Sequence, residues 1–271
     1  MNDFCLGVDV SSWQTKVDWK LLYDAGVRFA ICKVTQGNYI FDRMVREHVQ
    51  GARGAGMVVG LYHWHDPLNN VKSQLDFIKM CLSGLDYDFF ALDVEQYWAD
   101  WTEWRTGVIT KKLGATTISV SSHQLATDIR NFSGKKTVIY TRASFVKEYA
   151  PSMQVWLKDW ELWLAHYPYR AGRVSLSWEE LLGGNLPQIA GPSLPPNCRD
   201  WKFWQFSGDK FVLPGVNSAL DLNFFHGSEK ELREWAGIEQ GEGVPVAVDF
   251  ETMVRLLWQA HPELHKQEVK A

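Results

Sequence analysis

Short apolar runs recur along the chain, and each has the length and composition of a buried β-strand. The first five are nearly continuous rather than alternating, which is typical of strands covered on both faces. The pattern predicts eight strands, at residues 4–10, 27–34, 57–64, 88–95, 136–141, 161–167, 202–208 and 219–225.

Helical periodicity fills the gaps between the first six runs. It predicts helices at 17–25, 41–55, 69–83, about 117–130 and 143–150. Strand followed by helix, repeated five times, indicates a parallel sheet. The segments joining the last three runs are rich in Gly, Pro and Asn, with at most one helical turn near "WEELL". We therefore expect an α/β fold, a modified TIM-like barrel of eight strands and about five helices, (β/α)5(β)3, over residues 1–236.

The C-terminal part of the chain has a different pattern. Residues 237–248 include "GEGVPVAV", which predicts a flexible linker. Residues 249–271 are expected to be an amphipathic helix and tail, with Asp249 as a candidate N-cap. The helix could dock on the barrel, pair with another copy or contact a partner, so an oligomer formed through it stays open.

Composition narrows the function classes. The 271 residues are 46% hydrophobic and 22% charged, as in a globular protein, and they include 14 Trp. So many indole rings suit a large core, a sugar-stacking cleft or both. A net charge of -4 without a basic block argues against nucleic acid as partner. No apolar run predicts a membrane span, and "MNDFCLGVDV" does not resemble an export signal.

Acidic residues stand where several predicted strands end. In a barrel of this kind chemistry is located at the carboxyl ends of the strands. Strand 1 supplies Asp9, strand 4 supplies Asp93 and Glu95, and strand 8 supplies Asp221. An acid at a strand end is often only a turn former or a helix N-cap. Four of them on one rim favour a catalytic site.

The stretch "FFALDVEQYW" carries the closest acid pair. Residues i and i+2 of a strand face the same side, so Asp93 and Glu95 are expected to point inward together, with Cα atoms about 6.5 Å apart. Two nearby acids in a partly apolar cleft raise the pKa of one of them, which suits glycoside hydrolysis. Trp98, Trp101 and Trp104 follow and could stack on sugar rings, or could form one side of a helix.

Eight motifs in order resemble the strand motifs of the family-25 glycoside hydrolases, the Chalaropsis-type lysozymes. They are "GVDVSSWQTKVDW", "FAICKVTQG", "AGMVVGLYHW", "ALDVE", "VIYT", "LWLAHY", "FWQFSG" and "ALDLNFF". The resemblance implies an N-acetylmuramidase that cuts the β-1,4 bond between N-acetylmuramic acid and N-acetylglucosamine in peptidoglycan, without a cofactor or a metal. It places the acidic rim at Asp9, Asp93, Glu95 and Asp221, with Glu95 as the general acid.

The same resemblance suggests which side chains hold the glycan. We expect substrate contacts from Tyr62, His63, Lys33, Trp98, Tyr140, Tyr167 and Gln205. For Asp93 we favour orientation of the substrate's 2-acetamido group, with net retention, over an inverting scheme. Strand 2 departs from the family pattern, because Gln36 stands where a glutamate is common, and this leaves Lys33 without its usual ion-pair partner.

Two other interpretations remain open at this point. His63 and His65, two residues apart on one strand, could begin the metal site of a metal-dependent barrel hydrolase. A carbohydrate-binding relic that has lost hydrolysis is the second, although a binding-only site gains nothing from four clustered acids.

We expect the protein to be a phage endolysin, made in the host cytoplasm without a signal peptide and acting on the cell wall after release. A virion-associated lysin stays open.

Overall fold

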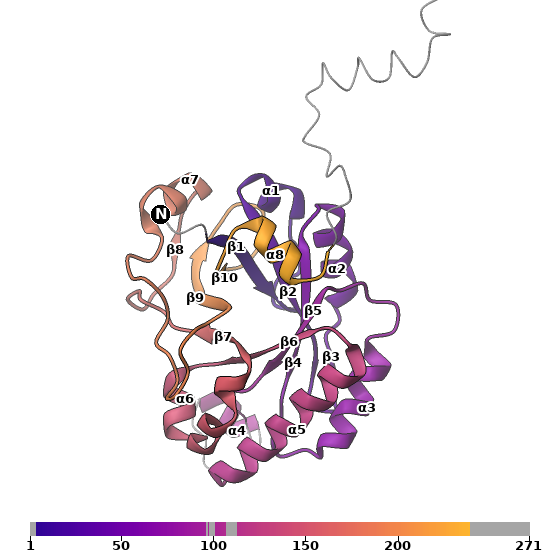
Figure 1. Cartoon of the computed structure of the whole chain (residues 1–271). Coiled ribbons are helices and arrows are strands. Elements are labelled where there is room, and N and C mark those ends of the chain that lie inside the picture. The colour runs from indigo at the N-terminus through magenta and orange to yellow at the C-terminus, as the bar shows by residue number, and fades with distance from the viewer. Residues whose placement is uncertain (1–3, 96, 98–100, 107–112, 239–271) are drawn as a thin grey trace, which may run out of the picture. The chain divides into compact units, whose positions relative to one another are not determined.

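A computed structural model describes residues 4–95, 97, 101–106 and 113–238 (Figure 1). Eight strands form a closed barrel in the order β1-β10-β9-β7-β6-β5-β4-β2, and β1 pairs with β2 to close it. They are β1 (Cys5–Val10), β2 (Val27–Gln36), β4 (Val58–Trp64), β5 (Phe89–Asp93), β6 (Lys136–Thr141), β7 (Glu161–Ala165), β9 (Phe203–Val212) and β10 (Leu220–Phe225). The predicted eight-stranded α/β barrel is confirmed.

One barrel strand runs against the others. The pairings from β1 through β2, β4, β5, β6 and β7 to β9 are parallel, but β10 is antiparallel to both β9 and β1. A short connection after β9 allows only a hairpin, which reverses the chain. This corrects the expectation for strand 8: Asp221 reaches the catalytic rim from the beginning of its strand, not from the end.

The helices predicted between the strands are present, with shifted ends. They are α1 (Trp19–Asp24), α2 (Val45–Gly54), α3 (Val71–Cys81), α5 (Ala115–Ser133) and α6 (Ala143–Glu148). The predicted start of α2 was four residues early, because Ile40–Phe41 pair with the end of β2 as the short strand β3. Helices α3 and α5 lie side by side on the outside of the barrel (Figure 1).

Several short elements were not predicted. They are the 3-10 helices Pro151–Val155 and Leu157–Asp159, the π-helical turn Leu181–Asn185, the strand β8 (Val174–Ser175) and the helix α8 (Glu229–Trp235). The helical turn expected near "WEELL" is α7 (Trp178–Glu180), and the helix considered for Trp101 and Trp104 is α4 (Trp101–Thr106). The π-helical turn, β8 and α8 lie after β7, where the sequence lacks helical periodicity. The predicted C-terminal helix lies outside the described residues.

Aromatic rings fill the end of the barrel at which the parallel strands begin. Phe89 and Phe203 stack at 5.1 Å between ring centroids, and Phe29 meets Phe203 at 5.2 Å. At this end, Trp235 of α8 contacts Phe89, Phe203 and Phe225. This end of the barrel is therefore an aromatic core, with the indole N–H of Trp235 donating to Glu161 Oε1 at 2.8 Å, and the acidic side chains of the predicted rim lie at the opposite end.

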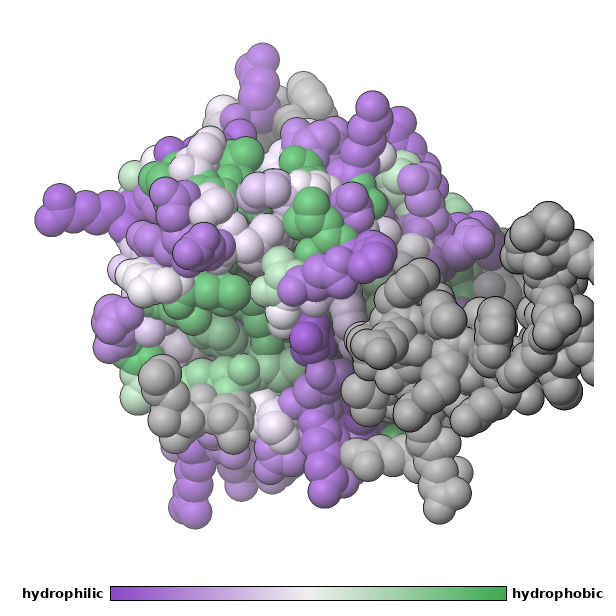
Figure 2. All heavy atoms as spheres, turned by 90° about the horizontal axis from the view of Figure 1, so that it is seen from above, coloured by the Kyte–Doolittle hydropathy of each residue, from purple (hydrophilic) through white to green (hydrophobic). Residues whose placement is uncertain are grey.

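The surface is mixed. Figure 2 shows hydrophilic side chains projecting around a smaller area of apolar ones. Among the described residues, no helix has both the length and the apolar character needed to span a membrane. The compact unit that holds the barrel ends at Gly237.

Candidate active site

Polar side chains from seven strands converge inside the barrel at the carboxyl ends of the parallel strands. Strand alternation places them there, because the residues two positions earlier on the parallel strands, and two positions later on the antiparallel β10, face the interior below. The set comprises Asp9 on β1, Lys33 on β2, Tyr62 on β4, Asp93 on β5, Tyr140 on β6, Gln205 on β9 and Asp221 on β10. All seven are residues that the sequence assigned to the site.

Gln205 connects two tyrosines to the first acid. Its Oε1 accepts hydrogen bonds from the hydroxyls of Tyr140, at 2.8 Å, and Tyr167, at 2.6 Å. Its Nε2 donates to Oδ2 of Asp9 at 2.8 Å, and Asn223 Nδ2 donates to the same oxygen at 2.8 Å. Trp163, below, donates its indole N–H to Asn223 Oδ1 at 2.7 Å. The Asp9 carboxyl is thus held in one orientation before any substrate binds.

Asp9 and Asp221 are opposite each other in the β1–β10 register. Burial raises the pKa of Asp9 to about 6, although the hydrogen bonds from Asn223 and Gln205 oppose the shift. Burial, and then the charge of Asp9, raise the pKa of Asp221 well above its ordinary value. The Asp209 N–H donates to Asp221 Oδ1 at 2.7 Å. Two adjacent carboxyls ionise together only at high cost, so the pair retains a proton toward neutral pH.

Asp93 ends strand β5, and Glu95 follows it by two residues. Asp93 is 3% exposed, Glu95 is partly buried, and Val94 between them packs into the outer core. Burial, and then the charge of Glu95, raise the pKa of Asp93 well above its ordinary value. Burial raises the pKa of Glu95 to about 7, against the opposing charges of Arg142 and Lys33. A carboxyl with that pKa can carry a proton near neutral pH.

One oxygen of Asp93 is left for a ligand. Its Oδ1 is buried, and no hydrogen-bond donor among the described residues reaches it. A buried acceptor without a partner is costly, and such groups are concentrated where a substrate or a water completes the site. The Asp93 carboxyl lies in the same part of the cleft as Glu95, since the charge of Glu95 raises the pKa of Asp93.

Lys33 has a hydrogen-bond partner although Gln36 carries no charge. Its Nζ donates to Gln36 Oε1 at 2.8 Å and lies 4.7 Å from the centroid of the Trp64 ring. Burial lowers the pKa of Lys33, whereas the negative charge of Asp93 opposes that shift. The partner that the sequence left missing is therefore an amide oxygen instead of a carboxylate.

His63 does not line the cleft, which corrects its assignment as a substrate contact. It alternates with Tyr62 on β4 and so faces the helices, fully buried. Gln74 of α3 accepts hydrogen bonds at Oε1 from His63 Nε2, at 3.1 Å, and from His65 Nδ1, at 3.2 Å. His63 Nδ1 accepts from the Thr35 hydroxyl at 2.8 Å.

The same contacts remove the basis for a metal site at this pair. Gln74, Thr35 and Ser121 together give both nitrogens of each ring a hydrogen-bond partner, so no ring nitrogen is left for a metal ion. The Gln74 amide is oriented by its own Nε2, which donates to the Asp66 and Asn69 carbonyls. Both histidines are therefore structural hydrogen-bonding groups between β4 and α3.

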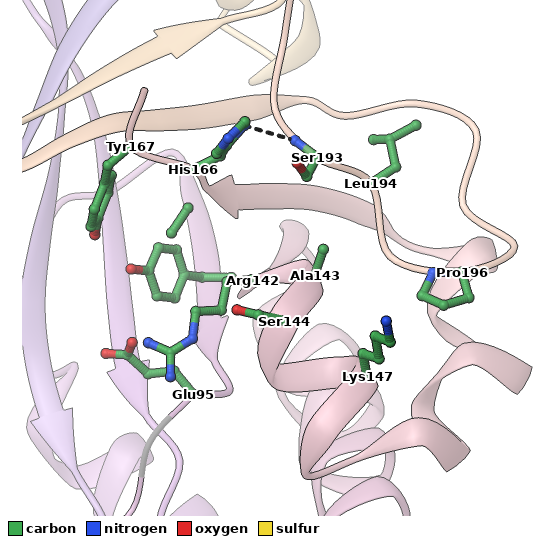
Figure 3. A pocket seen from close by; sticks show the side chains of 12 residues that line it. Glu95, Arg142, Ala143, Ser144, Lys147, His166, Tyr167, Ser193, Leu194 and Pro196 are labelled. Carbon is green, nitrogen blue, oxygen red and sulfur yellow. Dashed lines mark hydrogen bonds between the residues drawn. The ribbon is translucent and has the colours of Figure 1, made fainter. Parts of the chain in front are cut away.

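Two cavities open on either side of the Gln205 hydrogen bonds. The first, of about 680 Å³, is called the basic pocket here, and Figure 3 shows most of its walls. Its lining residues are Glu95, Tyr140, Arg142, Ala143, Ser144, Lys147, Ala165, His166, Tyr167, Ser193, Leu194 and Pro196. The second, of about 470 Å³, is called the acidic pocket, and its lining includes Asp9, Trp13, Tyr62, Arg173, Asp209 and Asp221.

Sequence reasoning missed Arg142, whose charge acts on both Asp93 and Glu95. The available signal was its position directly after β6, at the carboxyl end of a barrel strand. Trp13, 74% exposed in the loop after β1, was also missed. Trp98 and the side chains of Trp101 and Trp104 lie outside the described residues, so their expected stacking stays a prediction.

Comparisons with known proteins bear on the fold and on the family of the chain. The uncharacterized protein YegX of Escherichia coli O157:H7 is 29% identical over 241 residues, which is 86% of this chain and 74% of that protein. Lysozyme M1 of Streptomyces globisporus is 27% identical over 239 residues, covering 83% and 69%. A crystal structure of a bacterial lysozyme from Streptomyces coelicolor has the same fold, with a TM-score of 0.68 at 22% identity and coverage of 88% and 100%. The family model for glycosyl hydrolases family 25 matches residues 8–216, and with that match the chain belongs to the family-25 glycosyl hydrolases.

Proposed function

We propose that the protein is an N-acetylmuramidase that hydrolyses the β-1,4 bond between N-acetylmuramic acid and N-acetylglucosamine in peptidoglycan. The observation that carries this proposal is the pair at the end of β5. Glu95 has a pKa of about 7, and it lies in an open cleft beside a buried Asp93 with an unpartnered oxygen. Family membership supports the class of reaction, and the assignment of roles rests on the geometry.

In the proposed first step, Glu95 donates its proton to the glycosidic oxygen as the bond from that oxygen to C1 breaks. The carbonyl oxygen of the 2-acetamido group attacks C1 and forms a cyclic oxazolinium intermediate. Asp93 accepts a hydrogen bond from the acetamide N–H, which orients the group and stabilises the positive charge that develops on it. The unpartnered Oδ1 of Asp93 is a suitable acceptor.

In the second step, water attacks C1 and the acetamide is released, while the Glu95 carboxylate takes the proton from the water. C1 is attacked twice from opposite sides, so its configuration is retained. Asp9, held by Gln205 and Asn223, and Asp221 beside it are proposed to bind sugar hydroxyls in the acidic pocket. Tyr62, Tyr140 and Tyr167 are proposed to contact the rings.

Glu95→Gln tests the assignment of the general acid. The amide keeps the shape of the side chain but carries no transferable proton, so the rate of wall lysis should fall about 100-fold to 10,000-fold. Turbidity loss of purified walls measures the rate, and mass spectrometry of released muropeptides identifies the new N-acetylmuramic acid reducing ends. Near-normal release by a folded Glu95→Gln protein would remove Glu95 from this role.

Asp93→Asn tests the proposed role of Asp93 in the same assay and should give a partial loss of activity. Because the amide still presents an oxygen to the acetamide N–H, the loss should be smaller than for Glu95→Gln. Wall binding should persist in both variants, as measured by co-sedimentation with walls. A wild-type protein that binds walls but releases no muropeptides would instead favour the carbohydrate-binding relic.

We further propose that the protein acts as a phage endolysin, made in the host cytoplasm and acting on the wall after release. The support for this proposal is the muramidase reaction proposed above, because a phage must open the peptidoglycan of its host to be released. Cells that express the chain should lyse only after their inner membrane is permeabilised, as followed by culture turbidity. Lysis without permeabilisation contradicts it.

A further inference from the structure

The two pockets of the cleft have opposite charge. Among the described residues that line the basic pocket, Glu95 is the single acid, and it is opposed by Arg142 and Lys147. The acidic pocket contains Asp9, Asp209 and Asp221, and the charge of its Arg173 is paired with Asp209 at 2.7 Å. The difference indicates that different parts of one substrate occupy them.

Lys147 is available to a ligand. It is exposed in the last turn of α6, and within the described part of the chain no carboxylate forms an ion pair with it. Figure 3 shows its side chain on the same wall as Arg142 and Ser144. The facing wall is a loop that carries Ser193, Leu194 and Pro196.

That facing loop is fixed rather than loose. The Ser193 N–H donates to Nδ1 of His166 at 3.0 Å, and this bond ties the loop to the end of β7 (Figure 3). Leu194 is 37% exposed and adds an apolar surface. The result is a preformed pocket, cationic on one wall and apolar on the other, within the size range of small-ligand sites.

The glycan backbone has no charge to offer this cationic wall. In intact peptidoglycan the lactyl carboxyl of N-acetylmuramic acid is bound in an amide, so both sugars are neutral. The negative charges are the carboxylates of the peptide stem, which is attached to the muramic acid residue beside the scissile bond. A cation on the wall of a pocket next to Glu95 is within reach of that substituent.

We propose that the basic pocket binds the carboxylate-bearing peptide stem of the muramic acid residue at the cleavage site, and that Lys147 makes the enzyme select stems with free carboxylates. The inference rests on the proposed muramidase function and adds a part of the substrate to it. Arg142 also contributes charge, but its effect on Glu95 makes it unsuitable as the test residue.

The test compares two substrates and two charge reversals in the full-length protein. Purified peptidoglycan, free of phosphate polymers, is used either native or with its stem carboxylates converted to amides by carbodiimide coupling. We expect kcat/KM to be about two- to fivefold higher on the native substrate, as for an exposed ion pair. In Lys147→Glu the ratio of kcat/KM on native to that on amidated peptidoglycan should fall to about one. In Lys147→Gln this ratio should lie between the values for the wild type and for Lys147→Glu.

Lys136→Glu is the matched control. Lys136 is exposed at the first residue of β6, at the other end of the barrel, so the same change in net charge should leave the ratio as in the wild type. A wild-type ratio of one, or a ratio that Lys147→Glu does not change, overturns the inference while leaving the muramidase proposal intact. A Lys147 effect that is seen only when phosphate polymers are left on the wall overturns it too, since the bound anion would then be a phosphate.

Failure of the proposed function gives a different result. If neither substrate is cut, the muramidase proposal fails, and calorimetric binding of soluble native and amidated muropeptides to the full-length protein still decides the inference. Tighter binding of the native form, lost in Lys147→Glu, supports the pocket assignment. Equal binding of both forms contradicts it.

Discussion

At Glu95, burial and two nearby cations act in opposite directions on one carboxyl. Burial raises the pKa, Arg142 and Lys33 lower it, and the result is a value of about 7. Asp93 is more deeply buried, and the charge of Glu95 raises its pKa further. The sequence predicted that two acids would perturb each other, but not the cations, because Arg142 and Lys33 come from other strands.

The pH profile of the enzyme follows from this residue. A general acid works only when protonated, so kcat/KM should be maintained below pH 7 and fall as the pH rises through about 7. Because the Arg142 charge lowers the pKa of Glu95, Arg142→Gln should move the descending limb to higher pH. Initial rates of muropeptide release across pH 5–9 measure both profiles; an unmoved limb in Arg142→Gln argues against Glu95 as the titrating group.

The raised pKa of Glu95 should also make the free energy of unfolding depend on pH in a defined direction. The folded state binds the Glu95 proton more tightly than the unfolded chain, whose carboxyl titrates near the ordinary value of 4.5. The free energy of unfolding contributed by this group should therefore decrease between about pH 4.5 and 7. Glu95→Gln should flatten that part of the profile, as measured by urea unfolding at a series of pH values.

At the scale of elements, the two faces of each barrel strand are assigned different functions. On β4, Tyr62 faces the cleft, whereas His63 is hydrogen-bonded to Gln74 on the helix side. The strand was predicted correctly, but a nearly continuous apolar run does not reveal which of two neighbouring polar residues points inward. The assignment of His63 to the substrate failed for that reason, and so did the pairing of His63 with His65 as metal ligands.

Gly60 tests how tightly the strands close around the aromatic end of the barrel. A Cβ at Gly60 would lie 2.3 Å from the Phe89 ring, so Gly60→Ala must displace a packed ring and should destabilise the fold by about 1–3 kcal/mol. A matched control is Gly54→Ala at the end of α2, where a Cβ meets nothing within 4 Å and should be neutral or slightly stabilising. Denaturant unfolding compares them, and equal effects would contradict this packing argument.

At the scale of the whole molecule, the site exists because the barrel closes. Asp9 and Asp221 are opposite each other across the β1–β10 pairing, although one lies near the start of the chain and the other near the end of the barrel. Gln205 on β9 and Asn223 on β10 reach Asp9 from two strands late in the chain. Closure also separates an aromatic end from a polar end, and the proposed active site lies at the polar one.

The barrel should also be independent of the C-terminal segment. The compact unit ends at Gly237, so a chain truncated after Ile238 should fold, melt within about 2 °C of the full chain and release muropeptides at a comparable rate. Size-exclusion chromatography of both forms tests whether the segment mediates an oligomer. Loss of folding on truncation would show that the segment is part of the barrel domain.

The sequence by itself determined the eight barrel strands, the five helices between the first six of them and the acidic residues of the rim, because these depend on local periodicity and on motifs within single strands. It also identified the family. The tertiary structure alone decided which face each polar side chain takes, that β10 runs antiparallel, and that Arg142 acts on the proposed general acid. These features arise from contacts between segments distant along the chain, and the electrostatic field in a buried cleft is the sum of charges that only the closed barrel brings together.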